Sequence, residues 1–343
     1  MSVPSVSIAI PTYNKSSNLG LTLASLTLQT HKDFEVVILD DGSTDNTKAT
    51  IEHYSGKLKV VYVHQANSGR SAARNSAIRK ASGDLLILID DDRMVVPGFV
   101  EGHVTSYQRG GDSRLTMGWQ SGILARWFRN VELPASELVA ILRRRPELLQ
   151  KMGDDPVEFV TPEMIERDLP GVLKDFGTVD PYWAFLLGPQ IQFFGLELKG
   201  LALPYAMAAT ANMSVNRRLA LEVGLFDEGF RGWGFEDHEF QYRLHVAGAI
   251  SQISREAENH HQLHPRGAIL TKDWNRNGDY IIRKHPNLEV SLLAALLSNK
   301  ISPMTANEIL LSLKRDGGEH QSLAEQYRQT LHHELLWAFR QSV

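Results

Sequence analysis

Short apolar segments that alternate with stretches of helical spacing occupy the first ninety residues of the chain. We expect strands at residues 6–10, 34–39, 58–63 and 85–89, and helices at 18–29, 45–53 and 70–81. Near-continuous apolar strands separated by helices are typical of a parallel sheet that helices cover on both faces. The sequence therefore predicts an α/β fold with a Rossmann-like, mostly parallel sheet. Such sheets bind ligands beyond the carboxyl ends of their strands.

The composition allows a hydrophobic core and excludes several kinds of site. Of the 343 residues, 43% are hydrophobic and 22% are charged, values that are ordinary for globular proteins. The formal net charge of −4 argues against a general affinity for nucleic acid or for anionic membranes. Because the chain contains no cysteine, disulfides, cysteine-based zinc sites and thiol nucleophiles are excluded.

No segment has the pattern of a signal peptide or a membrane span. The apolar stretch at 6–10 is interrupted by Pro11, and the most apolar later window, residues 182–196, is short and contains glycine, proline and glutamine. We expect a cytoplasmic protein without a transmembrane segment. Peripheral contact with a membrane is also compatible with the sequence.

The change of pattern along the chain divides it into four regions: 1–113, about 114–205, about 206–265 and 266–343. The first holds the alternation of strands and helices. The second is looser, with helices expected at 135–151 and 162–168, and we interpret it as a helical insertion. The third begins with a strand at 208–215 and continues with helices. The fourth is expected to be a helical C-terminal extension.

The final helix of the extension carries an apolar stripe. Its members recur at every fourth position: Leu323, Tyr327, Leu331, Leu335 and Phe339. A stripe of this spacing buries one face of a helix against a partner. The partner is expected to be the main domain or another subunit, and the second alternative would give a homodimer through the C-terminal helices.

Three consecutive carboxylates, Asp90, Asp91 and Asp92, follow the fourth predicted strand. Carboxylates this close repel one another unless a cation compensates them. Hard oxygen ligands suit Mg²⁺ or Mn²⁺, which usually keep open positions for substrate phosphates. The alternative is a solvated turn that caps a helix, which would need one or two acidic residues rather than three.

Polar residues also follow the first two strands. Thr12 and Asn14 lie after the first, and Asp40 and Asp41 lie after the second, in a segment whose composition is equally typical of a turn. A carboxylate at this edge can accept hydrogen bonds from a base or ribose. Arg74, in the following helix, would match phosphate or the aspartate cluster, although a lone arginine on a helix is ordinarily at the surface.

The segment 232–237, with the sequence Gly-Trp-Gly-Phe-Glu-Asp, opens a helix. Acidic residues in a first turn complement the helix dipole, so a capping role is an alternative to chemistry. The glycines around Trp233 indicate a loop whose backbone comes close to another group. The indole offers a flat aromatic surface on which a sugar ring can stack. Of the nearby histidines, His260 and His261 would face opposite sides of a strand. His264 could join a metal, although any of the three could instead lie at the surface.

Taken in order, these segments resemble the motifs of family 2 glycosyltransferases of the GT-A fold. The resemblance covers roughly residues 4–265 and rests on the segments 6–14, 40–45, 67–75, 83–92, 211–218, 224–228 and 232–237. It implies a catalytic GT-A domain over 1–265, with a nucleotide-sugar half at 1–113 and an acceptor half at 206–265. It implies an enzyme that inverts the anomeric centre of a sugar taken from a nucleotide-diphosphate donor, with a UDP-sugar favoured.

The resemblance also implies roles on the donor side. Asp40 or Asp41 would bind uracil or ribose beside Thr12, and Asp90 would lie on the ribose side. Further donor-binding positions are Pro11, Tyr13, Asn14, Arg74 and Asp91. Asp92 would hold Mn²⁺ or Mg²⁺, and His264 is the first choice for an additional ligand, with His261 second.

On the acceptor side, Asp237 would be the general base and Glu236 would support it. Trp233 and Gly234 would contact the acceptor. A glycan, a peptide, a lipid-linked glycan and a small molecule are all compatible acceptors. The sequence departs from the family pattern at Arg93, where another acidic residue is usual, but the spacing of Asp90 and Asp92 is kept.

Two other functions are compatible with parts of the pattern. A nucleotidyltransferase would need a glycine-rich, basic phosphate loop after the first strand, where this chain has residues 11–14, Pro-Thr-Tyr-Asn. A non-catalytic sugar- or partner-binding module on the same fold is expected to lose the carboxylates, and all of them are present.

Overall fold

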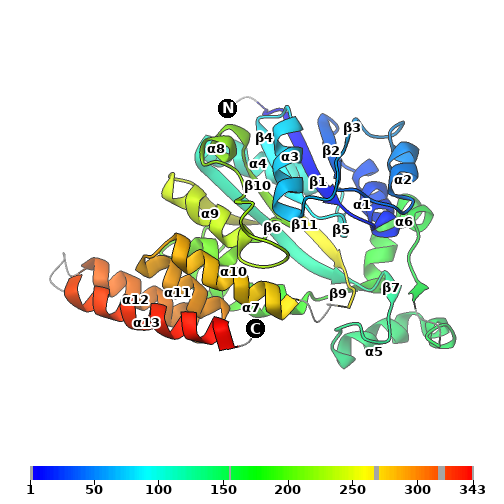
Figure 1. Cartoon of the computed structure of the whole chain (residues 1–343). Helices are drawn as coiled ribbons and strands as arrows, with labels where there is room; N and C mark the ends of the chain where they lie inside the picture. The colour runs from blue at the N-terminus through cyan, green and yellow to red at the C-terminus, as the bar shows by residue number, and fades with distance from the viewer. Residues whose placement is uncertain (1–2, 154–155, 266–269, 316–320, 342–343) are drawn as a thin grey trace.

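A computed structural model describes residues 3–153, 156–265, 270–315 and 321–341. One large mixed sheet runs through these residues, with helices on both faces (Figure 1). Its first part consists of parallel strands in the order β3 (Val60–His64), β2 (Phe34–Asp40), β1 (Val6–Thr12) and β4 (Leu85–Ile89). All four lie within two residues of their predicted positions. The α/β fold class is therefore confirmed.

The register of the parallel strands brings their polar ends together. Thr12 is paired with Asp40, and Ala9 is paired with both Val37 and Leu88. The carboxyl ends of β1, β2 and β4 therefore meet at one edge of the sheet. The polar residues that follow these strands start from this edge.

The second part of the sheet is mixed in direction. Its strands, which follow β4 in the order β10, β6, β11 and β5, are β10 (Asn212–Asn216), β6 (Arg114–Ile123), β11 (Ile250–Gln262) and β5 (Arg93–Val95). β10 is antiparallel to β4 and β6, while β6 and β11 are parallel. A short strand, β9 (Gly177–Thr178), is paired with β6.

The expected start of the helical insertion at 114 is wrong, because β6 lies inside the main sheet. Its sequence mixes apolar residues with arginine, glutamine, serine and two glycines, which gives a weak strand pattern. β6 is completed by β10 and β11, whose residues come about a hundred positions later. β11 was not predicted either. Pairing over such separations is not visible in a local pattern.

Helices cover the two faces of the sheet and form two separate cores. One face carries α1 (Ser16–Thr27), α2 (Thr47–Tyr54), α4 (Phe99–Gly110) and α6 (Pro162–Phe176). The other face carries α3 (Arg70–Lys80), α7 (Pro181–Phe194), α8 (Arg217–Glu222) and α9 (Glu236–Val246). Because side chains alternate along a strand, Ile8 and Ile10 enter the first core and Ala9 enters the second.

The segment between β6 and β9 forms an arm beside the first core (Figure 1). It contains β7 (Arg126–Trp127), β8 (Val157–Glu158) and α5 (Ala135–Arg144), and it leads into α6. Short 3₁₀ turns are found at Gly111–Ser113, Pro146–Gln150 and Pro204–Met207. The helices expected at 135–151 and 162–168 are both present. The first is shorter than predicted, and the second ends at a kink at Asp168, beyond which a further helical segment continues to Phe176.

The C-terminal region is helical, as expected, and has a core of its own. Its helices are α10 (Leu270–Lys284), α11 (Leu288–Leu297), α12 (Pro303–Arg315) and α13 (Gln321–Gln341). Figure 1 shows them gathered on the side of α9 and α7. None of the helices in the described ranges combines the length and the apolar composition needed to cross a bilayer.

The apolar stripe of α13 docks in part on its own chain. Leu331, Leu335 and Phe339 are buried in the core of the extension, and the Phe339 ring meets the Phe235 ring at 6.0 Å between centroids. Leu323 and Tyr327 remain exposed. The second half of the stripe is therefore buried within its own chain, against α10 and α11 of the extension and, at Phe339, against Phe235 of the main domain.

Candidate active site

A cavity of about 530 Å³ lies at the edge where the parallel strands end. Its walls come from the loops after β1 and β4, from the first turn of α9 and from the end of β11. Helix α10 of the extension adds a further wall. Segments from nearly the whole chain therefore meet at this place, which is also where an open α/β sheet binds ligands.

A buried arginine lies at the centre of the cavity. The guanidinium of Arg74 donates to Asp90 Oδ1 at 3.0 Å, to Asp237 Oδ1 at 3.1 Å and to Glu236 Oε1 at 3.3 Å. The arginine side chain is only 2% exposed. One planar, multidentate cation thus joins the end of β4 to the first turn of α9, a task that suits arginine better than lysine.

The two acidic residues of the α9 turn differ in their surroundings. Glu236 is 4% exposed, and its second oxygen accepts the backbone N–H of Gly234 at 2.8 Å. Burial, followed by the neighbouring Asp237, raises the pKa of Glu236 above its ordinary value. Asp237 is 21% exposed and accepts the Thr210 N–H at 3.2 Å. Both carboxylates line the cavity, but Asp237 is the more exposed of the two, and Glu236 supports the turn.

The backbone before this turn has an unusual conformation. Gly232 and Gly234 have φ values of +72° and +108°, and Phe235 has a φ of +68°. A Cβ on Gly234 would lie 2.6 Å from Cε3 of Trp274. Glycine is required here both by its backbone angle and by the close approach of α10.

The other end of the cavity holds the remaining aspartates with a lysine. The Lys15 ammonium lies 2.7 Å from Asp92 Oδ2 and 3.6 Å from Asp91 Oδ1, and Thr12 donates to Asp91 Oδ2 at 2.7 Å. Burial acts to raise the pKa of Asp92, but Lys15 and the bond to His264 hold it well below its usual value. Burial raises the pKa of Asp91 to about 6, against the effect of Lys15.

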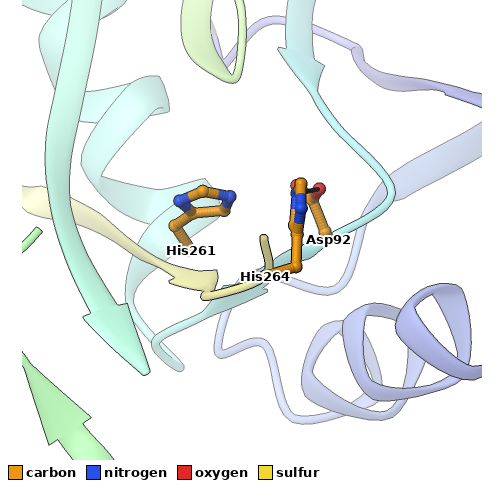
Figure 2. A group of neighbouring side chains, drawn as sticks. All are labelled: Asp92, His261 and His264. Atoms are coloured by element: carbon orange, nitrogen blue, oxygen red, sulfur yellow. Dashed lines mark ion pairs between the residues drawn. The ribbon is translucent and has the colours of Figure 1, made fainter. Parts of the chain in front are cut away.

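Asp92, His261 and His264 form a cluster with the chemistry of a metal site. One potential ligand atom from each lies within 4.8 Å of the others, and Figure 2 shows the His264 ring beside the Asp92 carboxylate. His264 Nε2 is 3.4 Å from Asp92 Oδ2. Asp92 Oδ1 is buried and accepts no hydrogen bond, and its ion-pair partner Arg93 Nε lies 3.5 Å away, which leaves a carboxylate lone pair for a cation.

His261 is held in the orientation that a ligand needs. Its Nδ1 lies 3.3 Å from Asp180 Oδ2, and a carboxylate on one ring nitrogen leaves the other for a metal. Burial, and then the charge of Arg93, lower the pKa of His261, so the ring is neutral near pH 7. His260, its neighbour on β11, points instead to the carbonyl of Gly122. The three side chains fit Mn²⁺ or a similar divalent ion.

Only some of the residues predicted to bind the base or ribose line the cavity in the structure. Asp41 lines the cavity while it accepts the N–H groups of Ser68 and Gly69, both at 2.9 Å. Asp40 does not line it, because its oxygens accept from Ser43 N at 2.8 Å and Tyr62 Oη at 3.0 Å.

Asn14 also lies away from the cavity. Its side-chain oxygen accepts the Thr44 N–H at 2.7 Å and joins two loops. For both Asn14 and Asp40, the contacts favour a turn-stabilising role over the predicted binding role. Pro11, Thr12 and Tyr13 line the cavity as expected.

An aromatic wall borders the turn of α9. The ring centroids of Trp233 and Trp274 lie 5.1 Å apart, with an angle of 31° between the ring planes. The Phe235 ring also packs on Trp274, with 4.4 Å between the centroids. Both indoles line the cavity. Asn277 of α10 is buried and donates to the carbonyl of Gly234 at 2.9 Å. The extension therefore shapes the loop that carries Asp237.

Comparison with known families agrees with this geometry. The family model described as Glycosyl transferase family 2 matches residues 7–167, and one described as the N-terminal domain of galactosyltransferase matches residues 193–264. A Streptomyces hygroscopicus protein named validoxylamine A glucosyltransferase is 31% identical over 312 residues. The chain belongs to glycosyl transferase family 2. The resemblance seen in the sequence is thus confirmed.

The relatives are longer than this chain. The match to the Streptomyces hygroscopicus protein covers 87% of this chain and 65% of that protein. A Pasteurella multocida protein named hyaluronan synthase is 30% identical over 271 residues, which are 76% of this chain and 25% of the synthase. The chain therefore spans less than two thirds of either relative.

Solved structures confirm the GT-A fold. S. aureus TarS 1–349 in complex with UDP-GlcNAc matches with a TM-score of 0.56 and 17% identity, over 99% of this chain and 81% of that one. The mannosyltransferase PcManGT from Pyrobaculum calidifontis, in complex with GDP-Man and Mn²⁺, matches with a TM-score of 0.56 and 15% identity, over 99% and 87%. At such identity the likeness concerns the fold alone.

The structure brings most of the predicted residues into one cavity. They are Pro11, Thr12, Tyr13, Asp41, Arg74, Asp90, Asp91, Asp92, Trp233, Gly234, Glu236, Asp237, His261 and His264. Sequence reasoning did not find Lys15, Asp180 and Trp274. A basic residue directly after the loop of the first strand was a signal for Lys15, and Asp180 before Pro181 was a helix-start signal. Trp274 had no local signal.

We expect Arg74→Met to destabilise the protein strongly. Removing the only partner shared by Asp90, Glu236 and Asp237 leaves buried like charges, and breaking a buried ion pair costs about 3–5 kcal/mol. The free energy of unfolding from urea denaturation measures the loss. Arg79→Met, on the exposed side of the same helix, is the control and should change stability by less than about 0.5 kcal/mol. Equal stability of the two variants would contradict the central role of Arg74.

Proposed function

We propose that the protein is a divalent-metal-dependent, inverting glycosyltransferase with a nucleotide-diphosphate sugar, preferably a UDP-sugar, as donor. The observation that carries the proposal is the arrangement of one cavity. The cluster of Asp92, His261 and His264 lines the same cavity as the Asp237 carboxylate, and Arg74 links Asp237 to Asp90, two residues before Asp92. Membership in family 2 and the names of the relatives support the same reaction class.

The donor would occupy the part of the cavity beside the ends of β1 and β4. Pro11, Tyr13 and Asp41 offer an apolar and a polar wall for the base and ribose. Asp92, His261 and His264 would hold the divalent ion, which when bound neutralises the departing diphosphate. PcManGT with GDP-Man and Mn²⁺ supports a divalent ion, while TarS with UDP-GlcNAc supports uracil as the base.

The acceptor would lie between Asp237 and the two indoles. The acceptor oxygen attacks the anomeric carbon, its proton passes to Asp237, and the bond from that carbon to the diphosphate oxygen breaks. Because attack and departure take place on opposite faces, the anomeric centre is inverted. Glu236 is too buried for this role, and its bonds to Arg74 and Gly234 fix the turn.

The regions of the chain then have separate tasks. We assign the donor to 1–113 and the acceptor to 206–265, and we add the first helix of the extension to the acceptor side because Trp274 and Asn277 build its wall. The paired indoles favour a ring with an apolar face, such as a sugar or cyclitol. A glycan, a glycan on lipid or peptide, and a small molecule all offer such a ring.

Donor binding is expected to require a divalent ion. Asp92→Asn should weaken the affinity for UDP in the presence of Mn²⁺ and abolish transfer, because the metal loses its only carboxylate in the cluster. Isothermal titration calorimetry with UDP, carried out once in Mn²⁺ and once in EDTA, measures the affinity. Asp33→Asn, at an exposed position, is the control. If wild-type protein binds UDP equally well in EDTA, the metal-dependent mechanism is wrong.

Asp237, not Glu236, is expected to be the general base. Removing a general base typically lowers the rate about 10²- to 10⁴-fold, so Asp237→Asn should lose transfer while it keeps Mn²⁺-dependent UDP binding. Glu236→Gln should lose less. Initial rates with a panel of UDP-sugars measure transfer, and titration with UDP measures donor binding, so a loss of catalysis is distinguished from a loss of binding. A dead Glu236→Gln beside an active Asp237→Asn would reverse the assignment, and two active variants would place the base elsewhere.

The two indoles are expected to act on the acceptor and not on the donor. Ring stacking contributes about 0.5–1.5 kcal/mol, so Trp233→Ala and Trp274→Ala should each raise the acceptor KM up to roughly tenfold with little change in the donor KM. Steady-state kinetics with the acceptor identified by screening measures both constants. Trp337→Ala, at an exposed position on α13, is the matched control. Unchanged acceptor kinetics would show that the tryptophans serve packing alone.

A further inference from the structure

Lys15 and the metal cluster share one carboxylate. The Lys15 ammonium lies 2.7 Å from Asp92 Oδ2, the same oxygen that faces His264 Nε2 at 3.4 Å. Asp91 adds a second carboxylate 3.6 Å from the ammonium. A divalent ion on Asp92 would therefore stand next to an ammonium group that already neutralises this aspartate.

The position of Lys15 allows it to leave this contact without loss of the cavity wall. The residue precedes α1 and follows the loop 11–13, which lines the cavity. Its side chain is 36% exposed and has four flexible methylene groups, whereas Asp92 is 7% exposed on a strand end. Between the two partners, the lysine is the one that can move.

We infer that Lys15 is a donor-binding residue that couples the metal to the nucleotide. Without nucleotide, its ammonium neutralises Asp92 and opposes the binding of a divalent ion. When the nucleotide binds, its diphosphate accepts the ammonium, and Asp92 loses its shortest ion pair and becomes available to the ion, with Arg93 Nε 3.5 Å from its other oxygen. The inference rests on the proposed function, because it needs both a diphosphate donor and a divalent ion.

This coupling has a consequence that a purely structural ion pair lacks. Binding linkage is reciprocal, so Mn²⁺ should strengthen UDP binding by the same factor by which UDP strengthens Mn²⁺ binding. Removing the ammonium should move the two single affinities in opposite directions, with tighter binding of Mn²⁺ alone and weaker binding of UDP. A structural role would loosen Asp92 and weaken both.

Lys15→Met tests the inference through binding alone. Free Mn²⁺ is measured by electron paramagnetic resonance during titration of the full chain, with and without saturating UDP. We expect Mn²⁺ alone to bind the variant about tenfold more tightly than the wild type, and the enhancement by UDP to fall by about tenfold or more, within the usual range of coupling between sites. Lys15→Arg keeps the charge and should keep most of the coupling.

The control is Lys57→Met, which removes an ion pair of the same length, 2.7 Å to Glu166, outside the cavity. It should bind Mn²⁺ and UDP as the wild type does. If Lys15→Met binds Mn²⁺ alone as the wild type does, or more weakly, the inference is overturned. The proposed function still stands in that case, provided that UDP binding by the wild type depends on Mn²⁺. If UDP binding by the wild type does not depend on Mn²⁺, both are wrong.

Discussion

The guanidinium of Arg74 is the interaction on which the rest of the site depends. It lies almost without exposure between Asp90 at the end of β4 and the acidic pair at the start of α9. A buried charge is tolerated only where partners surround it in good geometry. One side chain therefore fixes the position of the acidic pair on α9 relative to the end of β4.

The cavity contains two groups of acidic side chains. Around Asp92, a low carboxyl pKa and a neutral His261 provide ligands in the protonation states that a metal needs. Elsewhere in the cavity, Glu236 and Asp237 share Arg74, and Asp237 is the more exposed of the two. The side chains of Asp90 and Asp237 are 22% and 21% exposed, whereas Asp92 is 7% exposed and lies against Lys15 and His264.

The C-terminal helices take part in the site. Asn277 donates to the backbone of the loop before α9, and Trp274 fills the space that a side chain at Gly234 would occupy. Phe339 of α13 in turn packs on Phe235. The conformation of the turn before α9 therefore depends on residues that begin more than thirty positions later in the chain, which explains why a glycine is needed at 234.

The sequence by itself determined the parallel half of the fold and most of the cavity. Apolar strands that end in polar residues are local patterns, and parallel pairing places those ends at one edge, so Thr12, Asp41 and Asp92 were found together. Only the tertiary structure decided that β6 belongs to the sheet, that Asp40 and Asn14 stabilise turns, and that Lys15, Asp180 and Trp274 reach the cavity. These outcomes depend on pairing and packing between segments far apart in the chain, and on which hydrogen bonds a side chain has already made. A local pattern contains neither.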